Sequence, residues 1–105
     1  MKKFLALTMI LSSVSVFASM EVDSRPFEKT VFCNAIDKAL EEDQADMAVD
    51  MKGCLKAKMR TVGMEIGGSV IRGVVPFRSP NRDFTLKCSA TLSGKTVVSK
   101  TIKCI

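Results

Sequence analysis

The chain has 105 residues, a formal net charge of +5, four cysteines and neither histidine nor tryptophan. A chain of this length is expected to form one small domain, in which a hydrophobic core alone gives marginal stability. The lack of histidine removes the usual general base of nucleophilic hydrolases and the commonest side-chain metal ligand.

The first eighteen residues have the pattern of an export signal. Two lysines precede a short apolar run, and Val16-Phe17-Ala18 supplies the small residues of a cleavage site. The apolar run is too short for a membrane-spanning helix. We therefore expect residues 1–18 to be removed, residues 19–105 to form a single domain, and the protein to be periplasmic or secreted. The alternative is that residues 1–18 form an N-terminal helix of the mature fold.

Cysteine is the residue type that constrains this fold most. The four cysteines are Cys33, Cys54, Cys88 and Cys104. In a short exported chain an even number predicts two disulfides, each contributing about 2–4 kcal/mol. A zinc site is disfavoured because the sequence has no C-x-x-C pair and the thiols are spread widely. We predict a disulfide-stapled domain without metal or cofactor.

Charge is divided unevenly along the chain. Residues 21–50 carry a net charge of −6, whereas residues 51–105 carry +9. With the two lysines of the signal removed, the mature net charge is +3. Such asymmetry bears on partners and electric fields rather than on fold.

An amphipathic helix of about four turns is predicted from Pro26 onward. Pro26 suits the first turn of a helix, and Glu28 complements the helix dipole. The apolar residues that recur at helical spacing are Val31, Phe32, Ala35, Ile36, Ala39 and Leu40. Cys33 is expected on the flank of this apolar stripe.

The stretch from Val49 to Arg60 alternates with a period of two, and apolar residues or glycine occupy the odd positions. This pattern predicts a strand with one face on the core. An alternative is that the helix runs on to Met59, because a loose helical trace also persists. Gly53 and the clean alternation favour the strand.

A hairpin is predicted around Gly67-Gly68. Its register would place Val62 opposite Gly73, after a bulge near Arg60 that restores the core face. The second strand would run from 69 to 75 and end at Pro76, which cannot donate to a strand ladder.

Residues 84–92 alternate cleanly as a third strand, and a fourth strand follows Ser93-Gly94-Lys95. A two-residue turn is possible, but a three-residue turn places more apolar residues inside and is preferred. The preferred register separates Cys88 from Cys104 by about 13 Å, too far for a disulfide. We therefore expect Cys33 to bond one of these two. Cys54 falls on the polar face, and the connectivity stays open.

The elements together predict an α+β domain. One N-terminal amphipathic helix packs on a four-stranded antiparallel meander, giving two layers. This general shape resembles cystatin-like folds. The sequence lacks the Q-x-V-x-G hairpin and the late tryptophan by which cystatins are identified, so the resemblance implies no function.

A basic sheet face is the main candidate for binding. On the predicted strand, four cations project from one side: Lys52, Lys56, Lys58 and Arg60. Arg72, Lys87 and Lys103 join them if the parity of the neighbouring strands holds. The plainer interpretation is that these side chains are simply solvated and that the lysines prevent aggregation at a sheet edge.

The loop 77–82 is a second candidate. It combines Phe77 with Arg78 and Arg82 beside a rigid proline, a composition favoured in protein–protein hot spots. Alternatively it is an ordinary connection whose phenylalanine tucks into the edge of the core.

No catalytic pattern is present in the sequence. There is no G-x-S-x-G, the cysteines are expected to be oxidised, and Ser99 and Lys100 would point to opposite faces of a strand. The acidic residues 41–50 lack the spacing and the glycine of a calcium loop. Nucleic acid is disfavoured because the basic face has no aromatic residue for stacking.

We therefore predict a non-catalytic interaction or inhibitor-type protein that binds an acidic partner protein. The alternative is a cationic envelope protein that binds anionic lipid or glycan phosphate. A small hydrolase with unrecognised chemistry is a third hypothesis.

Overall fold

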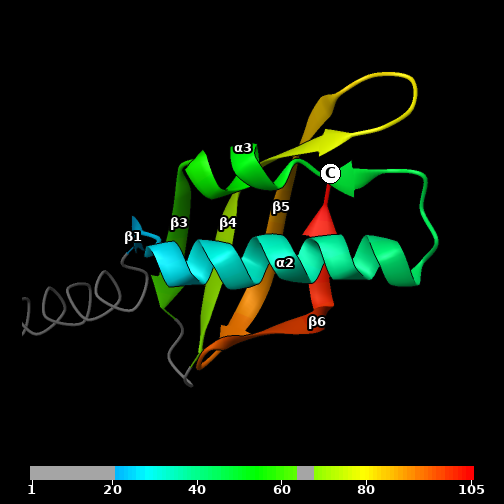
Figure 1. Ribbon diagram of the computed structural model, residues 1–105. Helices are drawn as coiled ribbons and strands as arrows, with labels where there is room; N and C mark the ends of the chain where they lie inside the picture. The colour runs from blue at the N-terminus through cyan, green and yellow to red at the C-terminus, as the bar shows by residue number, and fades with distance from the viewer. Residues whose placement is uncertain (1–20, 64–67) are drawn as a thin grey trace, which may run out of the picture.

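A computed structural model describes residues 21–63 and 68–105, so the predicted export signal lies outside the described residues. These residues have an α+β fold in which two helices pack against a mostly antiparallel sheet (Figure 1). The predicted α+β class is confirmed. The predicted single helix and four strands are wrong, because the described residues form two helices and six strands.

The elements follow one another as β1 (Glu21–Asp23), α2 (Pro26–Glu42), β2 (Ala48–Val49), α3 (Met51–Lys56), β3 (Met59–Gly63), β4 (Ser69–Arg78), β5 (Phe84–Ser93) and β6 (Thr96–Cys104). The strands lie in the order β1-β3-β4-β5-β6, and β2 pairs with the far half of β4. The predicted N-terminal helix is therefore preceded by a short edge strand.

Helix α2 crosses the strands on one face of the sheet, which we call the inner face; the opposite one is the outer face (Figure 1). It begins at Pro26 as predicted. The backbone N–H of Arg25 donates to Glu28 Oε1 at 2.8 Å and closes the first turn. Cys33 was expected on the flank of the helix, but it is completely buried.

The core lies between α2 and the inner face. Its buried residues are Phe32, Cys33, Ile36, Val49, Cys54, Met59, Ile71, Val75, Phe77, Cys88, Ala90 and Leu92. Along β4 and β5 these residues alternate with exposed or half-buried ones, as expected for a sheet with one covered face. The outer face therefore carries most of the polar and charged side chains of the sheet, together with a few apolar ones such as Val74.

The prediction of one strand from Val49 to Arg60 is wrong for the middle of this stretch. Residues 51–56 form α3, which separates two short strands, β2 and β3, that both pair with β4. Asp50 caps the helix, because its Oδ1 accepts from the Gly53 N–H at 3.3 Å. The helical turn directs Cys54 into the core rather than to the polar face.

Strand β3 has no bulge near Arg60, contrary to the prediction. Thr61 faces inward instead of Val62, and its hydroxyl donates to Glu28 Oε1 at 3.2 Å. The same hydroxyl lies 2.7 Å from Ser24 Oγ. The buried threonine is therefore satisfied by polar partners, which an apolar pattern does not indicate.

The β3–β4 register also differs from the prediction. Val62 pairs with Val70 rather than with Gly73, which pairs with Met59. Residues 64–67 lie outside the described residues. Strand β4 does not end at Pro76 but continues to Arg78. The Pro76 carbonyl accepts from Asp50 N–H at 3.0 Å, so the proline nitrogen also faces away from β5 and removes no β4–β5 bond.

Strands β5 and β6 are joined by the two-residue turn that the sequence disfavoured. Leu92 pairs with Val97 beside this turn, and the register then shifts further along β6. The shift restores an inner-face position for Cys104. The Thr101 hydroxyl stabilises the irregular segment, because it accepts from Thr91 N–H at 2.8 Å and donates to the Val98 carbonyl at 2.6 Å.

Two disulfides form, as predicted, but their pairing differs. Cys33 bonds Cys54 and joins the two helices, with Cα atoms 6.2 Å apart. Cys88 bonds Cys104 directly across β5 and β6, with Cα atoms 4.0 Å apart. The expected exclusion of Cys88–Cys104 was wrong because it rested on the wrong register. Two such bonds in a small protein are consistent with an oxidising compartment.

Candidate binding groove

A row of polar residues crosses the outer face at right angles to the strands. Arg60 pairs with Arg72, Arg72 with Ser89, and Ser89 with Lys103. One residue therefore comes from each of β3, β4, β5 and β6. At the usual strand spacing the row is about 14 Å long.

A second row runs parallel to the first, two residues away along each strand. On β4 and β5 it contains Val74 and Lys87, which are partners in the ladder. Ile105 continues it, because its backbone exchanges two hydrogen bonds with Lys87, at 2.9 and 3.0 Å. Lys58 precedes β3 and stands at the other end. The rows are about 7 Å apart at the usual strand rise.

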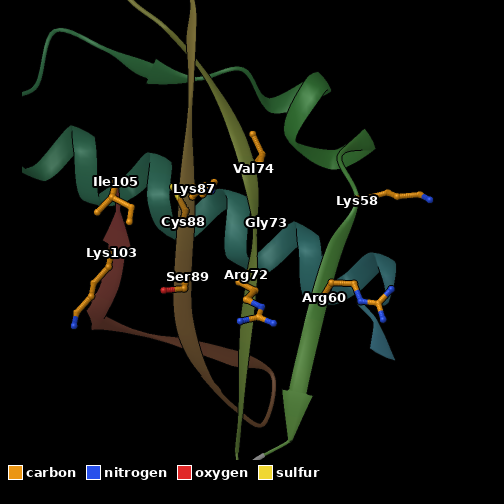
Figure 2. Close-up of a pocket in the computed structure, with 10 residues that line it drawn as sticks. All are labelled: Lys58, Arg60, Arg72, Gly73, Val74, Lys87, Cys88, Ser89, Lys103 and Ile105. Atoms are coloured by element: carbon orange, nitrogen blue, oxygen red, sulfur yellow. The ribbon is translucent and has the colours of Figure 1, made fainter. Parts of the chain in front are cut away.

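The space between the rows is an open groove of about 460 Å³ (Figure 2). Its floor is formed at Gly73 and Cys88, which lie between the two rows and belong to the inner-face register. Gly73 is required here, because a Cβ atom would lie 2.6 Å from Met59 Cγ beneath the floor. Among the described residues, the lining contains five cationic side chains and no aspartate or glutamate side chain.

Strand β1 neutralises one end of the groove. Asp23 Oδ1 lies 2.9 Å from Arg60 Nη1, and Glu21 Oε1 lies 3.4 Å from Arg60 Nε. Glu21 also forms an ion pair with Arg72. These pairs are partly exposed, and each is worth about 0–1 kcal/mol.

The three lysines of the groove have a different environment. Lys58, Lys87 and Lys103 are exposed, and none forms an ion pair within the described residues. Figure 2 shows Lys103 on β6 at one side and Lys58 near β3 at the other. The positive charge available to a ligand is therefore spread along the groove.

The predicted basic residues divide between two surfaces. Lys58 and Arg60 line the groove. Lys52 and Lys56 belong to α3 and lie outside the groove lining, because the stretch that carries them is helical. The prediction that all four project from one strand is therefore wrong, although Arg72, Lys87 and Lys103 do gather as the strand parity indicated.

The loop 77–82 offers less than its composition indicated. Phe77 is 1% exposed and stacks on Phe84, with ring centroids 5.5 Å apart. Arg78 reaches Asp50 at 3.4 Å. Arg82 is exposed, and its backbone N–H and carbonyl both contact Ser79 Oγ. The loop therefore presents two exposed arginines, one of them paired with Asp50, without an aromatic anchor.

Sequence reasoning missed part of the groove. Val74 and Ile105 are exposed apolar residues in the second row, at 47% and 86%. Ser89 lies in the first row between two cations. The pairing of Glu21 and Asp23 with the arginines was also missed, because no element was predicted before the helix that begins at Pro26. The alternation of Glu21-Val22-Asp23 was the available signal.

Comparison with known proteins gives no family. No protein-family model, curated protein or solved structure matches this chain. Neither described helix is long and apolar enough to cross a membrane.

Proposed function

We propose that this protein is a small non-catalytic binding protein that holds an acidic partner on the outer face of its sheet. The observation that carries the proposal is the groove, which within the described residues is lined by five cationic side chains and no aspartate or glutamate side chain, and is covered by neither α2 nor α3. A surface of this kind attracts anions over a range set by ionic strength and favours partners with complementary charge.

An exported location is part of the same proposal. The signal-like residues 1–18 and the two disulfides support a periplasmic or secreted protein. In such a compartment the acidic partner is a protein, with anionic lipid or glycan phosphate as the alternative. The groove favours a protein partner, because Val74 and Ile105 add apolar contact area to the cations.

Binding of poly-L-glutamate by isothermal titration tests the proposal. K87E/K103E changes two lysines of the groove, whereas K52E/K56E makes the same charge change on α3, outside the groove lining. We expect K87E/K103E to weaken binding by about tenfold and K52E/K56E by much less, since nearby charges dominate at physiological salt. Equal losses in both variants would contradict the proposal.

Vesicles distinguish the alternative partner. Wild-type protein is titrated with phosphatidylglycerol vesicles and with neutral phosphatidylcholine vesicles under the same salt conditions. The proposal predicts weaker binding to the anionic vesicles than to poly-L-glutamate. Tight binding to the anionic vesicles, together with none to poly-L-glutamate, would favour the envelope alternative.

A further inference from the structure

The groove has a direction, and this direction restricts its occupant. Its two walls run across β3, β4, β5 and β6 rather than along any one strand (Figure 2). A ligand that uses the whole groove is therefore elongated and lies at right angles to the strands. A single small anion would contact only one or two of the cations.

The cations alternate between the two walls toward β6. Arg72 is on the first wall, Lys87 is on the second, and Lys103 is again on the first. Successive side chains of an extended polypeptide also point to opposite sides. Neighbouring cations are about 4.8 Å apart across the strands, compared with about 3.3 Å per residue in an extended chain. Flexible lysine side chains absorb this difference.

The protein itself contains an example of the interaction. Strand β1 is an extended segment whose alternate residues, Glu21 and Asp23, contact the arginines at the β3 end of the same face. This face therefore already binds carboxylates that an extended segment presents to it. The lysines Lys87 and Lys103 extend the same chemistry beyond the reach of β1.

From these observations we infer that the groove takes an extended acidic segment of a polypeptide, which lies across β4, β5 and β6. Three consecutive acidic residues match Arg72, Lys87 and Lys103 on alternate walls. An apolar residue next to them rests on Ile105 or Val74. This inference rests on the proposed function and adds the conformation, orientation and sequence type of the partner.

The first test locates a bound peptide by NMR. A peptide containing Glu-Glu-Glu-Leu between glycines is titrated into the oxidised, ¹⁵N-labelled protein. The inference predicts shift changes at residues of both walls on β4, β5 and β6. Changes confined to one strand of the outer face would overturn the inference while leaving the proposed function intact. No binding of the peptide or of poly-L-glutamate would overturn both.

The second test blocks the groove without changing its charge. Ser89 and Ser93 lie on the same face of β5, but only Ser89 lines the groove. S89F should weaken peptide binding by about tenfold or more, whereas S93F should change it by less than about twofold, measured by fluorescence anisotropy. Equal affinities in S89F and wild type would overturn the inference. The NMR map on the unsubstituted protein decides the matter if S89F does not fold.

Discussion

Arg72 on β4 and Glu21 on β1 form an ion pair across the strand that separates them, β3. The same carboxylate lies 3.4 Å from Arg60 on β3. A three-residue edge strand therefore partly neutralises one end of a basic groove, and the remaining charge of the groove comes mainly from lysines on β5 and β6.

Neutralising β1 should strengthen anion binding. In E21Q/D23N the carboxylates that face Arg60 and Arg72 become neutral amides. Because each exposed pair is worth up to about 1 kcal/mol, we expect affinity for poly-L-glutamate to rise about twofold to tenfold. Titration calorimetry measures the change.

A matched control for this variant is E41Q/E42Q, which makes the same charge change on exposed residues at the end of α2. It should alter the affinity by less than E21Q/D23N. If both pairs have the same effect, net charge rather than β1 governs binding.

The disulfide pairing has a direct chemical test. A non-reducing tryptic map should join the peptide 30–38 to 53–56 through Cys33 and Cys54, and 88–95 to 104–105 through Cys88 and Cys104. Mass spectrometry before and after reduction identifies both linked pairs. A peptide linking Cys33 to Cys88 or Cys104 would contradict the fold.

The Thr101 hydroxyl should contribute measurably to stability. T101V removes the acceptor of the half-buried Thr91 N–H and the donor to Val98. Leaving such a group unsatisfied costs about 1–3 kcal/mol, so the free energy of unfolding in urea should fall by that amount. T96V is the control, because its hydroxyl makes only an exposed bond to Ser93. Equal stability of T101V and wild type would show that this contact does not fix the register shift between β5 and β6.

Gly73 should tolerate no side chain. Because an added Cβ would lie 2.6 Å from Met59 Cγ, G73A should destabilise the protein by about 1–3 kcal/mol. G63A is a suitable comparison on β3, since a Cβ there has no neighbour within 4 Å. Urea denaturation of both variants provides the measurement. If G73A loses no more stability than G63A, the Met59 side chain moves aside without an energetic penalty and the prediction is wrong.

Long periodic segments were predictable from the sequence, whereas short capped ones were not. Helix α2 and strand β5 follow their hydrophobic patterns over many residues. Helix α3 has only six residues, and the apolar residues within it happen to fit a strand. Its start depends on a single cap from Asp50, and the apolar alternation does not reveal that cap.

The register between β5 and β6 was predicted wrongly for a related reason. Counting apolar positions assumes an unbroken ladder between β5 and β6. The Thr101 side chain instead replaces ladder bonds and allows extra residues in β6. The resulting shift brings Cys104 opposite Cys88, the pairing that the sequence disfavoured.

The candidate site could be predicted only in part. Strand parity predicted that Arg72, Lys87 and Lys103 share one face, and the groove includes all three. Lys52 and Lys56 were misplaced because parity was applied to a stretch that is helical. The groove itself depends on which strands are neighbours, and that order cannot be read from local patterns.

The most direct measurement of the central claim is lysine footprinting of the unsubstituted protein. An amine-reactive reagent is applied with and without poly-L-glutamate, and labelling is quantified by mass spectrometry. All the compared lysines are exposed, so each is a control for the others. Bound polymer should protect Lys58, Lys87 and Lys103 while Lys38, Lys52 and Lys56 stay reactive. Equal protection of the two sets, or stronger protection on α3, would contradict a binding site on the outer face.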